Sequence, residues 1–334
     1  MAREPRRFTA EPAKRTATPL FIGLFGPSSS GKTYSALELA TGIQSVVGGD
    51  IVGIDTENRR MLHYADDFDF KHIDFQPPFG SLDYRDVIKA AEDMGAKTVI
   101  VDSMSHEHEG PGGMIELHEQ IARRMATWDG KFDPKKFERV KMLAWNEPKQ
   151  NRRALLNQLV RTNLNVVCCW RAKHTSKPQT VPVLDNNNQP TGRTKQEVVD
   201  MGYTPIGGEE FVFEMTVAAF LPPGARGVPV WEPEKPGEKA MVKLTKDHAW
   251  LREIAAKGRP LNRQIGAGLA RWALGTAAPK PEARQEPVET PREEPGLSEP
   301  DEPDRSQAAT GAGERANFDE DRRSHDDDSG YEGV

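Results

Sequence analysis

Cysteine is almost absent from the sequence, which has only Cys168 and Cys169 among its 334 residues. The two stand side by side in an apolar run, and successive side chains of a strand point to opposite faces of a sheet. We therefore expect neither a disulfide framework nor a zinc site. So little cysteine is typical of a protein of a reducing, cytosolic compartment.

Long apolar runs are also missing. None approaches the roughly 18 residues that a membrane-spanning helix needs. The basic stretch over residues 1–17 lacks the apolar segment of a secretory signal. The sequence therefore predicts a cytoplasmic protein with no membrane partner.

The acidic surplus of the chain is confined to its C-terminal end. The net charge is −6, but residues 275–334 hold 17 Asp and Glu against seven Lys and Arg. This segment repeats Pro and has almost no large aliphatic residues, so we expect it to be disordered. The chain then divides into a basic flexible arm (1–17), a folded domain (18–274) and a Pro-rich acidic tail (275–334). Such a tail could recruit a protein partner, compete with nucleic acid for the basic surface of the protein, or only keep the protein soluble.

Apolar runs alternate with helical patterns through the folded domain, which predicts an α/β fold with a doubly wound, mainly parallel sheet. A polar segment over 174–210 is predicted to be a long loop. The last predicted strands are 211–221 and 240–247. The other predicted strands cover 20–26, 50–56, 72–78, 97–103 and 164–173, and the predicted helices cover 32–46, 81–95, 114–128, 147–163 and 261–274.

A phosphate-binding loop is predicted at "GPSSSGKT", residues 26–33, which fits G-x-x-x-x-G-K-[ST]. The stretch lies between a predicted strand and a predicted helix, so backbone amides and the helix amino terminus would face the phosphates. Lys32 would reach the β- and γ-phosphates of ATP, and the Thr33 hydroxyl would hold Mg²⁺. The predicted nucleotide-binding residues of this loop are Gly26, Pro27, Ser28, Ser29, Ser30, Gly31, Lys32 and Thr33.

Hydrolysis also needs an acid that positions Mg²⁺ and a group that orients the attacking water. Asp102 ends an apolar strand, where a Walker B carboxylate belongs, and Ser103 follows it. For the base, the residues alone leave two candidates open. Glu57 follows the strand after the phosphate loop in "VGIDTEN", and Glu107 follows the Walker B strand in "DSMSHEHEG".

The order of these motifs resembles the RecA core of recombinases and hexameric ATPases. A phosphate loop is followed by "IDTEN", by "VIVDS" and by a strand ending in "WRAK". The resemblance implies that Glu57 is the catalytic base, with Glu107 second, and that Asp102 and Ser103 form the Walker B end. It also implies a homo-oligomer in which Arg171 and Lys173 complete a neighbour's site, although solvated charges at a strand end are an equal alternative.

A closer similarity is to phage-encoded RecA-like ATPases, including the Sak-type single-strand-annealing proteins. It is carried by "FGPSSSGKT", "IDTENR", "VDSMSHEHEGPGG", "AWNEPKQNRR" and "WRAK", over roughly residues 20–220. One departure is clear: RecA has a γ-phosphate-sensing Gln where this chain has Cys169 and Trp170. The resemblance implies ATP hydrolysis on single-stranded DNA in phage recombination, annealing or replication, in the host cytoplasm.

Single-stranded DNA is the partner that the resemblance implies, at two loops. The glycines Gly110, Gly112 and Gly113 lie where the first loop would be. The second is the segment after Lys173, which carries Lys177, Arg193 and Lys195 but also Glu197 and Asp200. A solvated surface loop is the alternative. Two other functions stay open: an ATPase that remodels or assembles a protein partner, and a nucleotide-gated binding module with negligible turnover.

Overall fold

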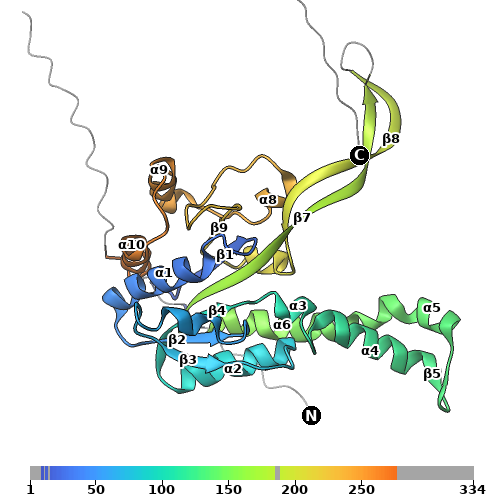
Figure 1. Cartoon of the computed structure of the whole chain (residues 1–334), viewed down its shortest axis with the longest axis horizontal. Coiled ribbons are helices and arrows are strands. Elements are labelled where there is room, and N and C mark those ends of the chain that lie inside the picture. The colour runs from blue at the N-terminus through green and yellow to red at the C-terminus, as the bar shows by residue number, and fades with distance from the viewer. Residues whose placement is uncertain (1–8, 11, 14–15, 185–188, 277–334) are drawn as a thin grey trace, which may run out of the picture. The chain divides into compact units, whose positions relative to one another are not determined.

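A seven-stranded sheet lies at the centre of the computed structural model, which describes residues 9–10, 12–13, 16–184 and 189–276 (Figure 1). Its strands follow the order β3-β2-β4-β7-β1-β9, and every neighbouring pair in this order is parallel, while β8 pairs antiparallel with β7. The strands are β1 (Phe21–Gly26), β2 (Asp50–Asp55), β3 (Lys71–Asp74), β4 (Ala96–Asp102), β7 (Asn165–Leu184), β8 (Pro190–Pro205) and β9 (Val217–Phe220).

Both faces of the sheet are buried at its centre, which explains why β1, β4, most of β2 and the first part of β7 are apolar. In β1, Phe21 and Phe25 belong to one apolar cluster and Leu24 to the other. Cys168 and Cys169 are both buried, free thiols that divide between the same two clusters, as their adjacency predicts. The predicted doubly wound, mainly parallel α/β sheet is confirmed, and it is consistent with a RecA-like core.

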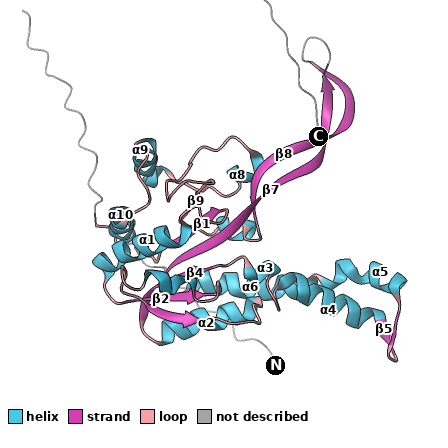
Figure 2. Cartoon of the chain, in the orientation of Figure 1, coloured by secondary structure: helices cyan, strands magenta, loops and turns pink. Residues whose placement is uncertain are grey.

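Helices cover the two faces, as Figure 2 shows. One cluster joins the sheet to α1, α9 and α10, and the other joins it to α2 and α6. The helices of the chain are α1 (Lys32–Val47), α2 (Ser81–Asp93), α3 (His106–Glu109), α4 (Met114–Ala126), α5 (Pro134–Ala144), α6 (Asn146–Arg161), α7 (Glu209–Val212), α8 (Pro236–Lys239), α9 (Trp250–Ala256) and α10 (Arg263–Ala273), with 3₁₀ turns η1 (Arg60–Tyr64) and η2 (Lys246–His248). Among the described residues, none of these helices is long and apolar enough to cross a membrane.

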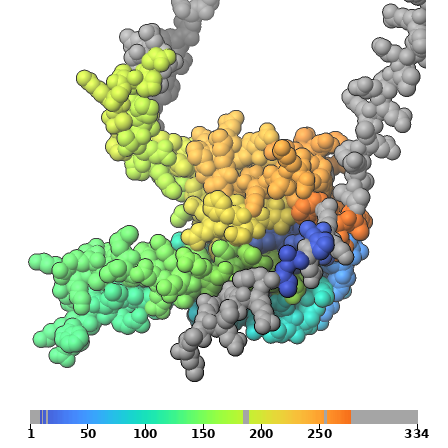
Figure 3. All heavy atoms as spheres, turned by 180° about the vertical axis from the view of Figure 1, so that it is seen from behind, coloured from blue at the N-terminus to red at the C-terminus, as the bar shows by residue number. Residues whose placement is uncertain are grey.

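A helical arm extends from the sheet in Figures 1 and 3, where it is drawn in green. It is formed by α4, α5 and part of α6, and its tip is the two-stranded sheet β5 (Thr127–Trp128) and β6 (Lys131–Phe132). The arm has a small core of its own around Ile121 and Ala144. Helix α5 begins where Asp133 accepts hydrogen bonds from the amides of Lys135 and Lys136, with Pro134 at the first helical position.

The predicted loop over 174–210 is wrong, because most of it forms the β7–β8 hairpin. The two strands pair from His174–Tyr203 outward to Leu184–Pro190. Most of their described side chains are exposed, so no apolar alternation marked them as strands; backbone hydrogen bonds form the ladder. Residues 185–188 at its end lie outside the described residues.

Two further predicted strands need correction. The strand predicted over 211–221 begins instead with the short helix α7, in which Phe211 packs 5.7 Å from the Trp170 ring, and only β9 is extended. The segment 240–247 makes a single antiparallel bridge, Ala218 to Lys243, and then turns into η2. Most of the arm over 1–17 and nearly all of the tail over 275–334 lie outside the described residues, so both stay predictions.

Helices α1 and α10 approach closely through two glycines. A Cβ added to Gly42 would lie 2.0 Å from the Arg263 carbonyl oxygen, and one added to Gly266 would lie 2.2 Å from that of Leu39. Because these atoms belong to the backbone, no side-chain movement relieves the clash. A Cβ added to Gly268, in the same helix, would meet only the side-chain ring of Trp250, at 3.1 Å.

We expect Gly266→Ala to lower the free energy of unfolding by about 1–3 kcal/mol, as overpacking does. Gly268→Ala should be neutral or raise it by up to about 1 kcal/mol, since alanine favours helix. Urea denaturation of the two variants measures the difference. Equal stabilities would contradict the close packing of α1 on α10.

Candidate functional site

The segment 26–33 joins the carboxyl end of β1 to the first turn of α1. Gly31 has a φ of +96°, and a Cβ there would lie 2.6 Å from the Gly227 amide nitrogen. A Cβ on Gly26 would lie 2.3 Å from the Leu221 carbonyl oxygen. Both glycines are therefore required by the backbone path, and the loop opens at the amino terminus of a helix, where anions bind.

Two neighbouring cavities open beside this loop and share Ser29, Lys32, Thr33 and Arg60. The smaller, of about 130 Å³, is lined by side chains of the loop and the start of α1, of the segment after β2 with η1, of the end of β4 and of β7. The larger, of about 490 Å³, continues it past two tyrosines. The smaller is lined by Ser28, Ser29, Lys32, Thr33, Glu57, Arg60, Asp102 and Arg171, and the larger by Ser29, Gly31, Lys32, Thr33, Tyr34, Arg60, His63 and Tyr64.

Lys32 curls back over its own loop. Its Nζ donates to the carbonyl oxygens of Gly26 at 2.9 Å and Pro27 at 2.7 Å. Burial lowers the pKa of the ammonium group, and nearby acids including Asp102 oppose that shift. Ser30, by contrast, turns inward: its Oγ is buried and makes no hydrogen bond within the described part of the chain. Lys32 is thus one of three cations that line the smaller cavity, with Arg60 and Arg171.

Thr33 and Asp102 meet across the cavity floor, where the Thr33 hydroxyl donates to Asp102 Oδ2 at 2.5 Å. Burial raises the pKa of Asp102 to about 6, and the Thr33 hydrogen bond acts against this rise. A hydroxyl and a carboxylate are hard oxygen ligands, and Mg²⁺ usually takes one or two carboxylates together with phosphates and waters. The donor set therefore fits Mg²⁺, which Thr33 and Asp102 would hold.

Glu57 lines the same cavity and is paired with Arg171. Arg171 Nη2 donates to both carboxylate oxygens of Glu57 at 2.5 Å, and its Nε donates at 2.9 Å. The Glu57 side chain is 13% exposed, so the pair is partly screened from solvent. In this conformation Arg171 occupies the carboxylate that a water-orienting base would use.

Arg171 reaches Glu57 of its own chain because of the strand order. Strand β7 lies between β1 and β4, with Arg171 opposite Gly26 and Cys169 opposite Asp102. The part of β7 that carries Arg171 therefore lies between residues 26–33 and Asp102. Of the four residues "WRAK", only Arg171 lines the cavity; Lys173 is exposed on the strand beyond it.

Cys169 and Trp170 stand where the resemblance places a phosphate-sensing Gln. Both are buried, and the Trp170 ring stacks on Phe25 at 4.8 Å. Neither lines the cavity, so neither replaces that Gln. Arg171, the next residue, is the polar group that β7 presents there.

Asp55 fixes the backbone before Glu57, a role that the sequence analysis missed. Its carboxylate accepts from the amides of Glu57 at 2.7 Å and Met61 at 2.8 Å, and it lies 3.2 Å from His72 Nε2. Asp55 is buried at the end of β2. The sequence did hold a signal for this role, because Asp55 is an acid at the end of an apolar strand, in the same "IDTEN" motif as Glu57.

Ser103 belongs to the scaffold beneath the site. Its amide donates to Thr56 Oγ1 at 2.8 Å, and its carbonyl oxygen accepts from the Tyr84 hydroxyl at 2.7 Å. His106 continues this network, with Nδ1 2.8 Å from Thr56 Oγ1 and Nε2 4.0 Å from Glu57 Oε1. Burial and then Arg171 lower the pKa of His106. Ser103 does not line the cavity.

Glu107, the second candidate for the base, lies outside both cavities. Its side chain is 2% exposed and accepts from Arg152 Nη2 at 2.6 Å and from the Ser81 hydroxyl. Arg152 is itself 8% exposed and also contacts His108 Nδ1 at 3.1 Å. The carboxylate therefore joins α3 to α2 and α6 and has no path to a water in the cavity.

The glycines predicted at a first DNA loop, Gly110, Gly112 and Gly113, form a packed turn. The Pro111 carbonyl oxygen accepts from the Phe79 amide at 2.8 Å. A Cβ on Gly113 would lie 2.7 Å from the Gly110 carbonyl oxygen, and one on Gly112 would lie 2.5 Å from Pro78 Cβ. This turn links α3 to the helical arm.

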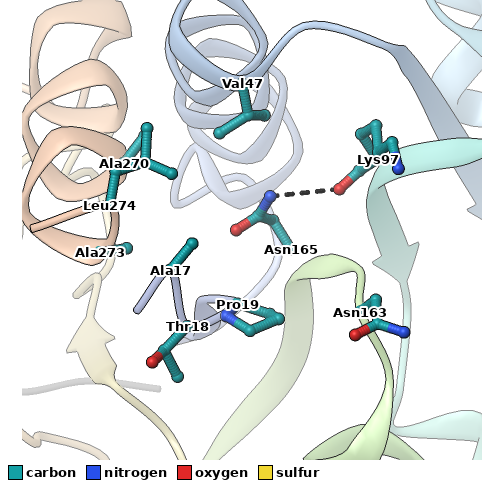
Figure 4. A pocket seen from close by; sticks show the side chains of 10 residues that line it. All are labelled: Ala17, Thr18, Pro19, Val47, Lys97, Asn163, Asn165, Ala270, Ala273 and Leu274. Carbon is teal, nitrogen blue, oxygen red and sulfur yellow. Dashed lines mark hydrogen bonds between the residues drawn. The ribbon is translucent and has the colours of Figure 1, made fainter. Parts of the chain in front are cut away.

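A third cavity, of about 310 Å³, lies at the opposite edge of the sheet (Figure 4). It opens beside Lys97 and Asn165, near the starts of β4 and β7, where Asn165 Nδ2 donates to the Lys97 carbonyl oxygen at 3.2 Å. Ligands of open parallel sheets bind at the carboxyl ends of the strands. This cavity is therefore separate from the candidate site.

Comparison with known proteins adds little. No protein-family model and no curated protein matches the chain. Among solved structures, it is similar to a KaiC-like protein from the hyperthermophilic archaeon Pyrococcus horikoshii OT3, at 12% identity and a TM-score of 0.25. The match covers 58% of this chain and 99% of that one. A TM-score this low supports no conclusion, so the assignment of the fold class depends on the strand order of the sheet alone.

We expect Glu107→Gln to lower the free energy of unfolding by about 3 kcal/mol, because it leaves the buried Arg152 guanidinium without its carboxylate. Glu119→Gln breaks the exposed pair with Arg123 and is the matched control, with an expected loss under about 1 kcal/mol. Chemical denaturation at pH 7 compares the two. A loss for Glu107→Gln no greater than that of the control would contradict a structural role for the pair.

Proposed function

We propose that the chain binds ATP with Mg²⁺ in the cavity beside residues 26–33 and hydrolyses it. The observation that carries this proposal is convergence: Lys32 and Thr33 at the start of α1, Glu57 after β2 and Asp102 at the end of β4 line one cavity. A phosphate cradle alone needs only the first two. The added carboxylates are those that phosphoryl transfer to water requires.

The triphosphate is proposed to lie on the loop, with Lys32 on its β- and γ-phosphates and Mg²⁺ at Thr33 and Asp102. Mg²⁺ supplies neutralisation of the phosphate charge. The larger cavity then suits the nucleoside. Tyr34 is 48% exposed there, with its ring 6.1 Å from that of Tyr64, and offers an aromatic face to a base.

Glu57 is proposed to orient the attacking water and to accept its proton. Arg171 must release the carboxylate for this to happen, and its guanidinium would then be free to stabilise the charge that develops on the γ-phosphate. Both groups line the same cavity, so the exchange needs only a side-chain movement. In the proposed cycle, the ion pair is therefore the arrangement that Arg171 must leave before hydrolysis.

Single-stranded DNA is proposed as the substrate on which the ATPase acts, in phage recombination, annealing or replication. Support comes from the β7–β8 hairpin, which continues directly from Arg171. Lys177 and Arg193 lie exposed on it with no carboxylate partner among the described residues, whereas Lys195 pairs with Glu197 at 3.1 Å. Such cations suit phosphate contacts. The phage role and a homo-oligomer, with Lys173 facing a neighbour, rest on the motif resemblance alone.

Phosphate release tests this function, measured with and without an oligo(dT) single strand. We expect Lys32→Ala to lose ATP binding and hydrolysis. Glu57→Gln should keep ATP affinity within a few-fold while its kcat falls about 10²- to 10⁴-fold, the usual loss of a general base. Single-stranded DNA should raise the wild-type rate, and the effect should weaken as salt rises.

Glu107→Gln, checked for folding by circular dichroism, is the control for the loss of a neighbouring carboxylate. Normal hydrolysis by Glu57→Gln together with loss in Glu107→Gln would contradict the assignment of the base. A rate that ignores DNA at low salt would contradict the DNA role and favour a protein partner. ATP binding without any phosphate release would leave a nucleotide-gated binding module.

A further inference from the structure

The tip of the helical arm presents a tryptophan to solvent on a rigid turn. Asp129 and Gly130 have φ angles of 49° and 72°, the positive values of a two-residue hairpin turn. This turn joins β5 to β6 and sets Trp128 opposite Lys131. Trp128 is 81% exposed, so the hairpin holds the indole outward with an ammonium group on the neighbouring strand.

Aromatic packing supports the tip from beneath. The Phe132 and Phe137 rings meet edge to face at 5.6 Å, and the Arg123 guanidinium lies 5.8 Å and 5.7 Å from their centres. Phe137 also packs against the small core of the arm. The position of Trp128 is therefore set by a folded support.

Uncompensated positive charge surrounds the same tip. Lys131, Lys135, Lys136 and Arg139 have no carboxylate within ion-pair distance among the described residues. The other cations of α4 and α5 are paired: Arg123 with Glu119, Arg124 with Glu147, and Lys141 with Glu138. Two acids lie nearby in the sequence: Asp133 accepts from backbone amides as the cap of α5, and Asp129, in the turn itself, forms no ion pair with these cations among the described residues. The arm tip is defined here as Trp128, Lys131, Lys135, Lys136 and Arg139.

A single exposed indole among free cations matches one kind of partner best. A protein or membrane partner needs a larger apolar area than Trp128 and the 44% exposed Phe132 offer, and the most exposed apolar residues of α5, Met142 and Leu143, lie about 10 Å further along the helix. Single-stranded nucleic acid needs what the tip has: an aromatic face for one base and cations for its phosphates. Base stacking is tolerant of sequence, because every base has a π-face.

We propose that the arm tip binds single-stranded nucleic acid, with one base stacked on Trp128 and the phosphates beside it on Lys131, Lys135, Lys136 and Arg139. This surface is additional to the β7–β8 hairpin, and it rests on the proposed function in taking a single strand as the substrate. It gives a role to an arm that the ATP site does not use.

Fluorescence anisotropy of the full chain with labelled dT₂₀ and rU₂₀ tests the proposal, without nucleotide and over a series of salt concentrations. Trp128→Ala should weaken binding about tenfold, within the range for one base–aromatic stack, and leave the salt dependence unchanged. Trp128→Phe should recover most of the affinity. Lys135→Gln/Lys136→Gln/Arg139→Gln should reduce the slope of log K against log salt by about 2, or about 0.7 per cation.

Two matched controls sit elsewhere in the chain. Phe213→Ala removes an aromatic side chain that is 80% exposed. Lys246→Gln/Lys257→Gln/Arg259→Gln removes three exposed cations that have no carboxylate partner among the described residues. Both should bind dT₂₀ as the wild type does. Circular dichroism checks that every variant is folded.

If both tip variants bind the oligonucleotides with unchanged affinity and salt slope, the proposal is overturned. This holds even if the tip is then found to bind a protein or an anionic vesicle. A hairpin variant, Lys177→Gln/Arg193→Gln, separates this failure from that of the proposed function. Loss in the hairpin variant alone would keep the DNA role and refute the arm tip. Loss in the tip variants alone would support the arm tip and remove the hairpin from the DNA role.

Discussion

The position of β7 between β1 and β4 is the constraint on which the site depends. Because these three strands are parallel, β1 and β4 end at the same edge of the sheet, and Arg171 lies there within β7, between residues 26–33 and Asp102. Strand β2, on the other side of β4, brings Glu57 to the same edge. The apolar faces that hold the strands in this order thus also determine which polar groups meet.

The ion pair between Glu57 and Arg171 connects this edge to the rest of the molecule. Glu57 is fixed from one side by Asp55, which accepts its amide, and Arg171 belongs to the strand that becomes the β7–β8 hairpin. A ligand that moves the start of the hairpin would change the contact between Arg171 and the carboxylate. In the proposed function, this is the shortest physical route between DNA and ATP hydrolysis.

Local patterns were enough to predict the apolar strands of the sheet and the phosphate-loop motif. Each strand end carries its own signal, and "GPSSSGKT" stands between a strand and a helix. Pairings over long sequence distances were not predictable: Arg152 lies 45 residues from Glu107, and nothing in either segment indicates the other. The β7–β8 hairpin was missed because its exposed strands lack apolar alternation. Helix α5 was missed although Asp133 and Pro134 mark its start.

The central claim is that the cavity beside residues 26–33 is a Mg²⁺·ATP site with Glu57 as its base. A crystal structure of the Glu57→Gln variant with ATP and Mg²⁺ tests it most directly. The account predicts an intact triphosphate on the loop, a metal ion bound by Thr33 and Asp102, and Arg171 turned from position 57 toward the γ-phosphate. Nucleotide bound elsewhere, or a loop that stays empty at saturating ATP, would contradict it.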